Sequence, residues 1–308
     1  MSAVLSIVTP AYNAEGVIDR AVQSIVPQLT ENVEWIIVDD GSTDEGGALL
    51  DSLAASYRQI RVIHTKNRGA GAARNIGIRE ARGEWIVFLD ADDYLADAAI
   101  ADIISVGAHA GKVVDIIYLP KIMSNMKGDE FQVVYPETKI QDGLPEIEFW
   151  SSVYRLQYLK ERKVYFPEYR EQDVETAFRL LAFNRTNRVN IQRHPIFLVH
   201  RDNPNSNVHT WSPERLLRVK SIVYSNLIEE LSDAPLNVRK KIVGTLYTCV
   251  DQYVIGLIRG GICPSCEQLG VVLGLGKDAL KKPCSGKTWM KKILFIMLEP
   301  IALMKKRK

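Results

Sequence analysis

Three carboxylates follow directly on an apolar run. Trp85–Leu89 contains no charged residue, and Asp90, Asp92 and Asp93 come next in the chain. Clustered negative charges repel one another unless a cation lies among them, and carboxylates with few histidines or thiols nearby suit Mg²⁺ or Mn²⁺. Asp90 and Asp92 are therefore candidate metal ligands. The alternative is a helix start, where acidic residues are favoured by the helix dipole. Asp93 is placed to cap the following helix.

Two other polar segments also end strand-like runs, and one sheet would bring all three together. Short apolar runs alternate with segments of helical spacing, which predicts a mainly parallel sheet flanked by helices. Functional groups collect at the carboxyl ends of such strands, so Thr9–Asn13, Asp39–Asp44 and Asp90–Asp93 are expected at one edge. Ser42 and Glu45 have the spacing of a capping box. The predicted strands are Val4–Thr9, Trp35–Val38, Arg61–His64, Trp85–Leu89 and Val113–Leu119, with helices over 14–27, 44–58, 70–82 and 97–110.

The chain is expected to divide into two domains. Ser212 followed by Pro213 fits a helix start, and later signals are mainly helical. We therefore predict an α/β domain over 1–211 and a helical C-terminal region over 212–308 that ends in a basic amphipathic segment. Before that boundary the patterns predict excursions or a short hairpin within 126–144, helices over 145–161 and 170–184, and a strand over 194–200. The second of these helices is expected to turn Val174, Phe178, Leu181 and Ala182 inward.

Composition excludes several classes of protein. The 308 residues are 46% hydrophobic and 25% charged, as expected for a soluble globular chain. Four cysteines make no disulfide framework and no leader precedes the first strand, which predicts a cytoplasmic protein. No run reaches the roughly 18–20 apolar residues that span a membrane. Cys263 and Cys266 have zinc-like or redox-like spacing without the matching context, and Lys281 stands where a phosphate-binding loop ending at Thr288 requires glycine.

The net charge of +2 is unevenly distributed. Residues 277–308 carry ten Lys and Arg against Asp278 and Glu299, which leaves 29 basic and 35 acidic residues for the rest of the chain. Within 288–308, lysines flank bulky apolar residues, a pattern that favours a helix lying in the headgroup region of an anionic membrane. The alternative is a helix packed on the protein's own core or on a partner subunit. Nucleic acid is not an expected partner, because no reading motif is present.

Four motifs occur in order along the chain: "IVTPAYN", "VDDGSTD", "NRGAGAARNIGIREARGEWIVFLDADD" and "EQDVETAFRL". Together they resemble the inverting glycosyltransferases of family 2, which have the GT-A fold, and the resemblance covers roughly residues 3–205. It implies a Rossmann-like, mainly parallel sheet with a helical C-terminal extension. It also implies a nucleotide diphosphate sugar as donor, typically a UDP-sugar, Mn²⁺ or Mg²⁺ as cofactor, and a glycan or lipid-linked saccharide as acceptor.

The resemblance assigns donor-binding roles by position. Asp40 would accept a hydrogen bond from the base ring, while Asp39 supports the turn. Arg74 would approach the base and diphosphate, where its fixed fork suits phosphate oxygens. Asp90 would meet the ribose and Asp92 the metal. The base would be cradled by Thr9, Pro10, Ala11 and Tyr12. Helix start and close packing explain Gly69, Gly71 and Gly77 better than ligand contact does.

The resemblance also assigns the base that takes the proton from the acceptor hydroxyl. Asp173 aligns with this base, and one direct displacement would invert the anomeric configuration. The family frequently has Glu before this Asp, whereas here it is Gln172, which supplies no negative charge. The pKa of the base is therefore expected to differ from that in relatives with Glu.

Residues 200–210 resemble the family's flexible segment that folds over the donor. Arg201 would meet phosphate, and His200 or His209 would either complete the metal shell or be ordinary loop residues. Trp150 or Trp211 would either stack on an acceptor sugar or belong to the core or surface.

The patterns favour one functional class, disfavour a second and leave a third open. The expected protein is a metal-dependent glycosyltransferase of surface polysaccharide synthesis, peripheral on the inner face of the membrane. A sugar-1-phosphate nucleotidyltransferase would show a glycine- and arginine-rich loop after the first strand, and "TPAYNAEG" is not such a loop. A catalytically degenerate nucleotide-sugar-binding scaffold stays open because of Gln172.

Overall fold

The computed structural model of the chain describes residues 4–124, 131–136, 149–168, 174–186, 188–192 and 198–201. All of them belong to the first of two units, Met1–Thr210 and Trp211–Lys308. The helical region predicted over 212–308, with its basic segment 288–308, lies outside the described residues and stays a prediction.

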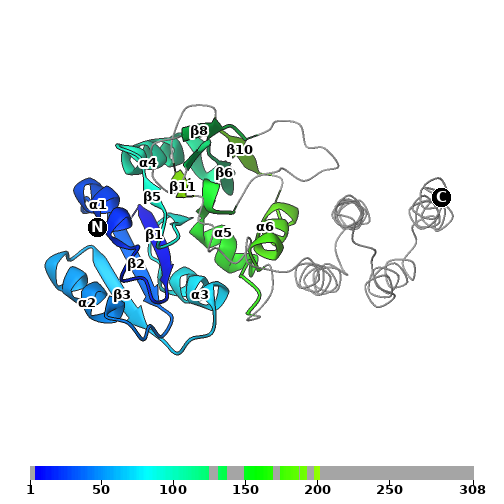
Figure 1. Ribbon diagram of the computed structural model, residues 1–308. Coiled ribbons are helices and arrows are strands. Elements are labelled where there is room, and N and C mark those ends of the chain that lie inside the picture. Colours follow the sequence, from blue (N-terminus) through cyan, green and yellow to red (C-terminus); the bar gives the residue numbers. More distant parts are fainter. Residues whose placement is uncertain are drawn as a thin grey trace, which may run out of the picture. The chain divides into compact units, whose positions relative to one another are not determined.

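A seven-stranded, mainly parallel sheet forms the centre of the first unit (Figure 1). Its strands are β1 (Leu5–Ala11), β2 (Val33–Asp39), β3 (Ile60–His64), β4 (Trp85–Phe88), β6 (Ile116–Tyr118), β9 (Ser152–Arg155) and β10 (Val189–Ile191). Their order is β10-β6-β9-β4-β1-β2-β3. β1 runs parallel to β2 and β4, β2 to β3, and β10 to β6. Only β9 among these strands is antiparallel to its neighbours, β4 and β6.

A smaller sheet joins segments that are distant in the sequence. It contains β5 (Tyr94–Leu95), β7 (Lys121–Ser124), β8 (Phe131–Val134) and β11 (Leu198–Arg201), in the order β5-β11-β7-β8. β7 and β8 are the two strands of the predicted hairpin, which begins earlier than expected. β5 follows the acidic cluster directly and pairs with β11, so the chain after Asp93 is held by a strand from near residue 200.

The helices α1 (Asp19–Ile25), α2 (Gly46–Ser56), α3 (Ala70–Glu80), α4 (Ala99–Ala110), α5 (Leu156–Glu161) and α6 (Val174–Asn184) pack around these sheets. α3 packs on β1 and β2, and α2 on β3. The predicted helix over 145–161 is wrong: its described part is a 3-10 turn at Phe149–Ser151, then β9, and only then α5. The inward face predicted for α6 is confirmed, because Val174, Phe178, Leu181 and Ala182 are all buried.

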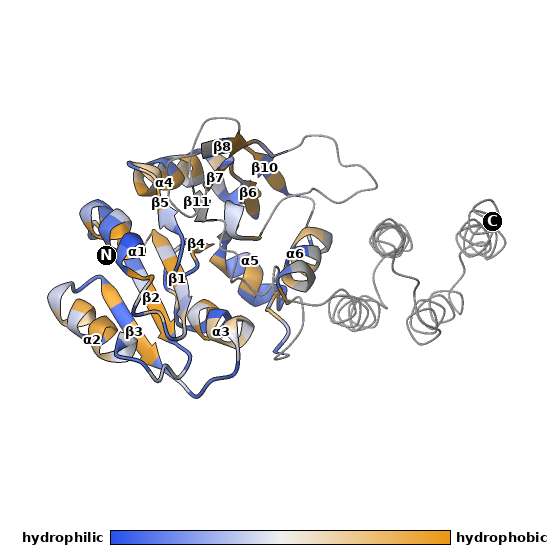
Figure 2. Ribbon diagram, in the orientation of Figure 1, coloured by the Kyte–Doolittle hydropathy of each residue, from blue (hydrophilic) through white to orange (hydrophobic). Residues whose placement is uncertain are grey.

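The central strands are buried because protein covers both faces of the sheet. Every residue of β2 and of β4 is buried, and Figure 2 shows hydrophobic residues along these strands with mixed character on the helices. α3 approaches β1 so closely that a Cβ on Gly77 would lie 2.3 Å from Val8 Cγ1. Close packing of Gly77, as the sequence indicated, is thereby confirmed.

Five aromatic rings join α6 to the sheet. Phe88 of β4 lies 5.6 Å from Phe178 of α6 between ring centroids, and Phe166 stacks on Phe178 at 3.9 Å and 3°. Phe149 and Tyr154 complete the cluster. Each ring removes a large apolar area from water, so the cluster fixes α6 and residues 164–168 against β4.

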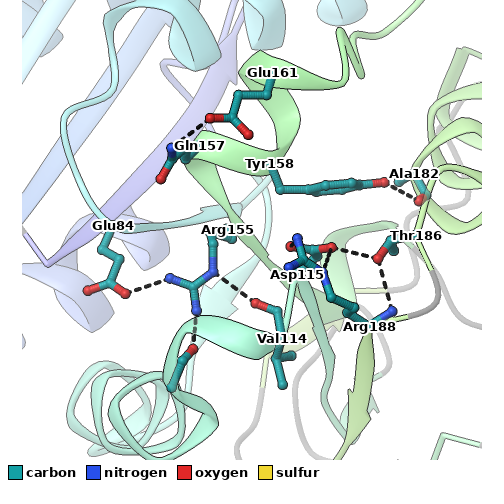
Figure 3. A network of polar contacts seen from close by, with 11 residues as sticks. Glu84, Val114, Asp115, Arg155, Gln157, Tyr158, Glu161, Ala182, Thr186 and Arg188 are labelled. Carbon is teal, nitrogen blue, oxygen red and sulfur yellow. Dashed lines mark hydrogen bonds and ion pairs between the residues drawn. The ribbon is translucent and has the colours of Figure 1, made fainter.

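A polar network holds the opposite end of α6 (Figure 3). The carboxylate of Asp115, which is 1% exposed, accepts hydrogen bonds from Arg188 at 2.6 and 2.7 Å and from Thr186 at 2.6 Å. Tyr158 of α5 donates its hydroxyl hydrogen to the carbonyl of Ala182. The C-terminal part of α6 is therefore joined to α5, and the chain leading to β10 is joined to the residue that precedes β6.

Candidate active site

The predicted polar segments meet at the carboxyl edge of the main sheet. Ala11 of β1 is paired with Asp39 of β2, and Asp40 donates its backbone N–H to the carbonyl of Ala11 at 2.8 Å. The N–H of Leu89 bonds to the carbonyl of Val8 at 3.0 Å, which places Asp90 beside the end of β1. The sequence-predicted convergence of three loops therefore exists, while the roles of the individual residues stay predictions.

The four residues predicted to cradle the base differ in exposure. Tyr12 is 51% exposed, whereas Thr9 is 0% and Ala11 1% exposed. The Thr9 hydroxyl accepts a hydrogen bond from Trp35 Nε1 at 2.9 Å, so this side chain serves the core. Pro10 is half-buried. Of these four side chains, Tyr12 offers the largest accessible surface to a ligand.

Asp40 is buried, and its carboxylate organises the start of α3. One oxygen accepts the backbone N–H of Arg68 at 2.9 Å and the other that of Gly69 at 2.7 Å. Gly69 has φ 95°, a conformation that side chains with Cβ rarely adopt, so glycine is required at this helix start. Asp40 thus links the end of β2 to the loop before α3.

The loops after β1 and β2 are also bonded to each other. Asn13 donates its backbone N–H to Ser42 Oγ at 2.9 Å, and Thr43 donates its backbone N–H to Asn13 Oδ1 at 2.8 Å. The predicted capping box is wrong, because Ser42 Oγ is used by Asn13 and α2 begins after Glu45 without a side-chain cap. The cross-link fixes Tyr12, which lies between Ala11 and Asn13, beside Asp40.

His64 bridges two carboxylates at the end of β3. Its Nδ1 lies 2.8 Å from Asp39 Oδ2 and its Nε2 2.9 Å from Asp51 Oδ1. Hydrogen bonds with Asp51 and then Asp39 raise the pKa of His64, and partial burial lowers it by less. Burial raises the pKa of Asp39, but hydrogen bonds from Ser42 and His64 lower it by more. Sequence reasoning missed His64, although a polar residue at the end of a predicted strand was a usable signal.

We expect this bridge to make stability depend on pH. Because the folded pKa of His64 is raised above its ordinary value of 6.5, its stabilisation is complete below that value and is lost as pH rises through the folded pKa. Asp39, with its lowered pKa, stays ionised across this window. His64→Gln should therefore lower Tm by roughly 1–3 °C at pH 6 and by less at pH 9. Thermal melts against pH measure this.

His109→Gln provides the matched control. His109 is an exposed histidine of α4 whose ring contacts the carbonyl of Ser105. Its recorded partner is a carbonyl and not a carboxylate, so His109→Gln should lower Tm at pH 6 by less than His64→Gln. Equal pH dependence in the two variants would contradict a specific role of the His64 bridge.

Arg74 lies in the interior, between carboxylates from two elements. Its Nη2 is 2.6 Å from Asp90 Oδ1, and its Nη1 is 3.0 Å from Glu175 Oε1 on α6. The side chain of Arg74 is 2% exposed, and its guanidinium group forms ion pairs with these two protein carboxylates. Contact with donor phosphates stays a prediction. Sequence reasoning did not assign Glu175 a role, because helical spacing alone does not show which buried charge a residue meets.

The acidic cluster fits a metal only as part of a larger site. The described residues contain no group of three or more His, Cys, Asp or Glu side chains able to hold an ion. Mg²⁺ and Mn²⁺ sites in nucleotide enzymes often use one or two carboxylates and substrate phosphates, and Asp92 with Asp90 fits that arrangement. Arg74 already binds one oxygen of Asp90, so we expect Asp92 to be the main protein ligand.

Asp93 does not cap the next helix. It is 2% exposed and donates its backbone N–H to the carbonyl of Asp90, forming a turn. α4 begins only after Ala98. The predicted capping role of Asp93 is therefore wrong, and its backbone instead closes the loop that carries Asp90 and Asp92.

Several predicted residues are placed only in part or not at all. β11 includes His200, the last residue of the strand predicted over 194–200, and also Arg201, which was expected only in the segment over 200–210. Nothing is described of either side chain. Trp150 is 8% exposed, and Lys121 Nζ lies 4.9 Å from its ring centroid. The remaining predicted residues lie outside the described part of the chain: Gln172, Asp173, His209, Trp211, Cys263 and Cys266.

The sequence of the chain is similar to those of glycosyltransferases. The model of "Glycosyl transferase family 2" matches residues 6–166, just over half of the chain. "Uncharacterized glycosyltransferase EpsJ" of Bacillus subtilis is 30% identical over 67% of this chain and 63% of its own length. "Poly(ribitol-phosphate) beta-N-acetylglucosaminyltransferase TarS" of Staphylococcus aureus is 26% identical over 60% of this chain and 33% of its own. The chain thus spans less than two thirds of these relatives.

Comparisons of structure agree on the fold. The crystal structure of S. aureus TarS 1-349 matches with a TM-score of 0.67 and 20% identity over 90% of this chain and 80% of that one. "Mannosyltransferase PcManGT from Pyrobaculum calidifontis in complex with GDP-Man and Mn2+" matches with a TM-score of 0.58 and 16% identity over 99% and 88%. At such identities the likeness concerns the fold, and the predicted GT-A fold is confirmed.

Proposed function

The chain belongs to glycosyl transferase family 2, and from this we propose that it moves a sugar from a nucleotide diphosphate donor, a UDP-sugar, to a hydroxyl of an acceptor. The acceptor proposed is a glycan or lipid-linked saccharide in surface polysaccharide synthesis. The support for a UDP-sugar donor is the solved structure of TarS in complex with UDP-GlcNAc, and the support for a surface-polymer acceptor is the poly(ribitol-phosphate) in the name of TarS.

One observation supports the proposal of a donor site: the exposed Tyr12 directly follows Ala11, whose carbonyl accepts the backbone N–H of the buried Asp40 at the sheet edge. Tyr12 offers an apolar face, and Asp40 is held by two backbone N–H groups. Each carboxylate oxygen has about two acceptor positions, so Asp40 retains capacity for the ring N–H of a base. A flat ring with one N–H, such as uracil, matches this pair.

The chemical step needs a base, and the proposed base is Asp173. It would accept the proton of the acceptor hydroxyl as the oxygen attacks the anomeric carbon, and the single displacement would invert the configuration. A bound Mn²⁺ or Mg²⁺ would stabilise charge on the departing nucleotide diphosphate. Asp92 would hold the ion, while Asp90, oriented by Arg74, would hold the ribose.

A panel of nucleotide sugars with Mn²⁺ tests the proposal. We expect UDP-sugars to raise Tm by several degrees at concentrations well above Kd, because ligands that bind only the folded state stabilise it. ADP- and CMP-sugars serve as controls, and transfer is then measured by released nucleotide. Stabilisation without any transfer would favour the scaffold function that Gln172 left open. A larger effect of GDP-sugars would correct the choice of base, and no stabilisation by any donor would refute the proposal.

We also propose that residues 288–308 contact an anionic membrane on its cytoplasmic face. None of the helices within the described ranges is long and apolar enough to cross a bilayer. The support is the placement of lysines on both sides of an apolar run. Sedimentation with anionic liposomes, with and without this segment, distinguishes the proposal from packing within the protein.

A further inference from the structure

Arg74 is a fully charged side chain in an apolar environment. The guanidinium carbon lies 4.6 Å from the ring centroid of Phe149 and 5.3 Å from that of Phe166. Burial lowers the pKa of Arg74, but Asp90 and Glu175 raise it by more, so the group stays charged. Such a charge carries a large desolvation cost unless its partners stay in place. Its two carboxylate partners are therefore restrained along with it.

The two partners belong to different parts of the site. Asp90 follows β4 by two residues and begins the acidic loop, whereas Glu175 lies in the first turn of α6. Arg74 Nη1 lies 3.0 Å from Glu175 Oε1, and both the charge of Glu175 and hydrogen bonding with it raise the pKa of Arg74. Among the described residues, Glu175 is the residue of α6 that forms an ion pair with Arg74.

The neighbouring residue fixes the chain on the other side of Asp173. Asn75, 2% exposed, donates to the carbonyl of Phe166 at 2.7 Å and accepts the N–H of Phe166 at 2.8 Å. Residues 164–168 and α6 are therefore both attached to consecutive positions of α3. In sequence, Asp173 lies between these attachments and immediately precedes α6.

We propose that Arg74 is a positioning residue, which holds the first turn of α6 against the acidic loop through its pairs with Glu175 and Asp90, and that this turn orients the proposed base, Asp173, which immediately precedes it in the sequence. The inference rests on the proposed function, because it concerns the same transfer reaction. Arg74 thus acts on the side of the proposed base as well as on the donor side. A misplacement of about 1 Å in a catalytic group can cost 10²-fold in rate.

The test weakens one link and leaves the donor-side pair intact. Glu175→Gln removes the negative charge that α6 presents to Arg74, while the Arg74–Asp90 pair remains. Glu84→Gln is the matched control, because Glu84 is also a half-exposed partner of a buried arginine: Glu84 Oε1 lies 2.6 Å from Arg155 Nη1. Side-chain exposure is 43% for Glu175 and 54% for Glu84.

We expect Glu175→Gln to lower kcat about 10- to 100-fold and to change the donor KM less than about twofold. The chemical step depends on the position of the base, whereas donor binding does not. Glu84→Gln should change kcat less than about twofold. An unchanged kcat in Glu175→Gln, or an equal loss in both variants, would overturn the proposal. A raised donor KM with unchanged kcat in Glu175→Gln would also overturn the proposal, because the Arg74–Glu175 pair would then act on donor binding alone.

A second readout does not depend on turnover. Amide hydrogen exchange of the peptide covering α6 should become faster in Glu175→Gln and stay unchanged in Glu84→Gln. If the original protein transferred no sugar, the proposed function would fail while this readout still decided whether Arg74 restrains α6. Unchanged exchange in Glu175→Gln would show that the pair does not restrain the helix.

Discussion

Asp173→Asn is expected to lower turnover by about 10²- to 10⁴-fold, the range typical of a missing general base. Asparagine has nearly the same shape as aspartate but does not accept a proton at neutral pH. Donor binding should persist, because the proposed donor site consists of residues in the loops after β1, β2 and β4. Single-turnover transfer and nucleotide-sugar binding with Mn²⁺ measure the two effects separately.

Glu171→Gln is the matched control for this experiment. It removes a carboxylate two residues away and should leave turnover within about threefold of the original value. Unchanged turnover in Asp173→Asn would refute Asp173 as the base. Equal losses in both variants would indicate a dependence on local charge in place of proton transfer.

Asp92→Asn is expected to abolish the Mn²⁺-dependent part of donor binding and to lower kcat/KM by about 10²-fold or more. The neutral amide is a weaker ligand for a hard divalent cation than a carboxylate. Titration of Mn²⁺ in the presence of UDP-sugar, followed by the change in Tm, measures the effect.

Asp97→Asn tests whether position or only total charge matters here. Asp97 is an exposed aspartate shortly after the acidic loop, so the two variants change net charge equally. We expect normal Mn²⁺ dependence in Asp97→Asn. If Asp92→Asn kept the same Mn²⁺ dependence as the original protein, Asp92 would not be the metal ligand.

The main strands were predictable because burial on both faces leaves a simple signal. Trp35–Val38 and Trp85–Leu89 are uninterrupted apolar runs, and both coincide closely with observed strands. β9 was missed because Ser152–Arg155 continues into α5 without a turn residue, so the two elements read as one helix. Tertiary pairing with β4 and β6 decides its conformation, and local sequence does not encode those neighbours.

The candidate site was predictable in its location but not in its internal bonding. The carboxyl ends of parallel strands meet by geometry, so the meeting of Tyr12, Asp40 and Asp90 follows once the strands are known. The burial of Arg74 between Asp90 and Glu175 depends on how α6 packs, which no spacing rule shows. For the same reason Ser42 was misinterpreted as a cap, because a contact with Asn13 from another loop satisfies it.

The pairing of β5 with β11 has a consequence for biosynthesis. Leu95 pairs with Leu198, so the segment that follows the acidic loop gains its strand partner only after roughly a hundred further residues have left the ribosome. Contacts of such large sequence separation form late and slow the folding of a chain. A nascent chain that already holds every residue of "DADD" would therefore lack the support of this loop, and nucleotide capture should begin only when synthesis has passed β11.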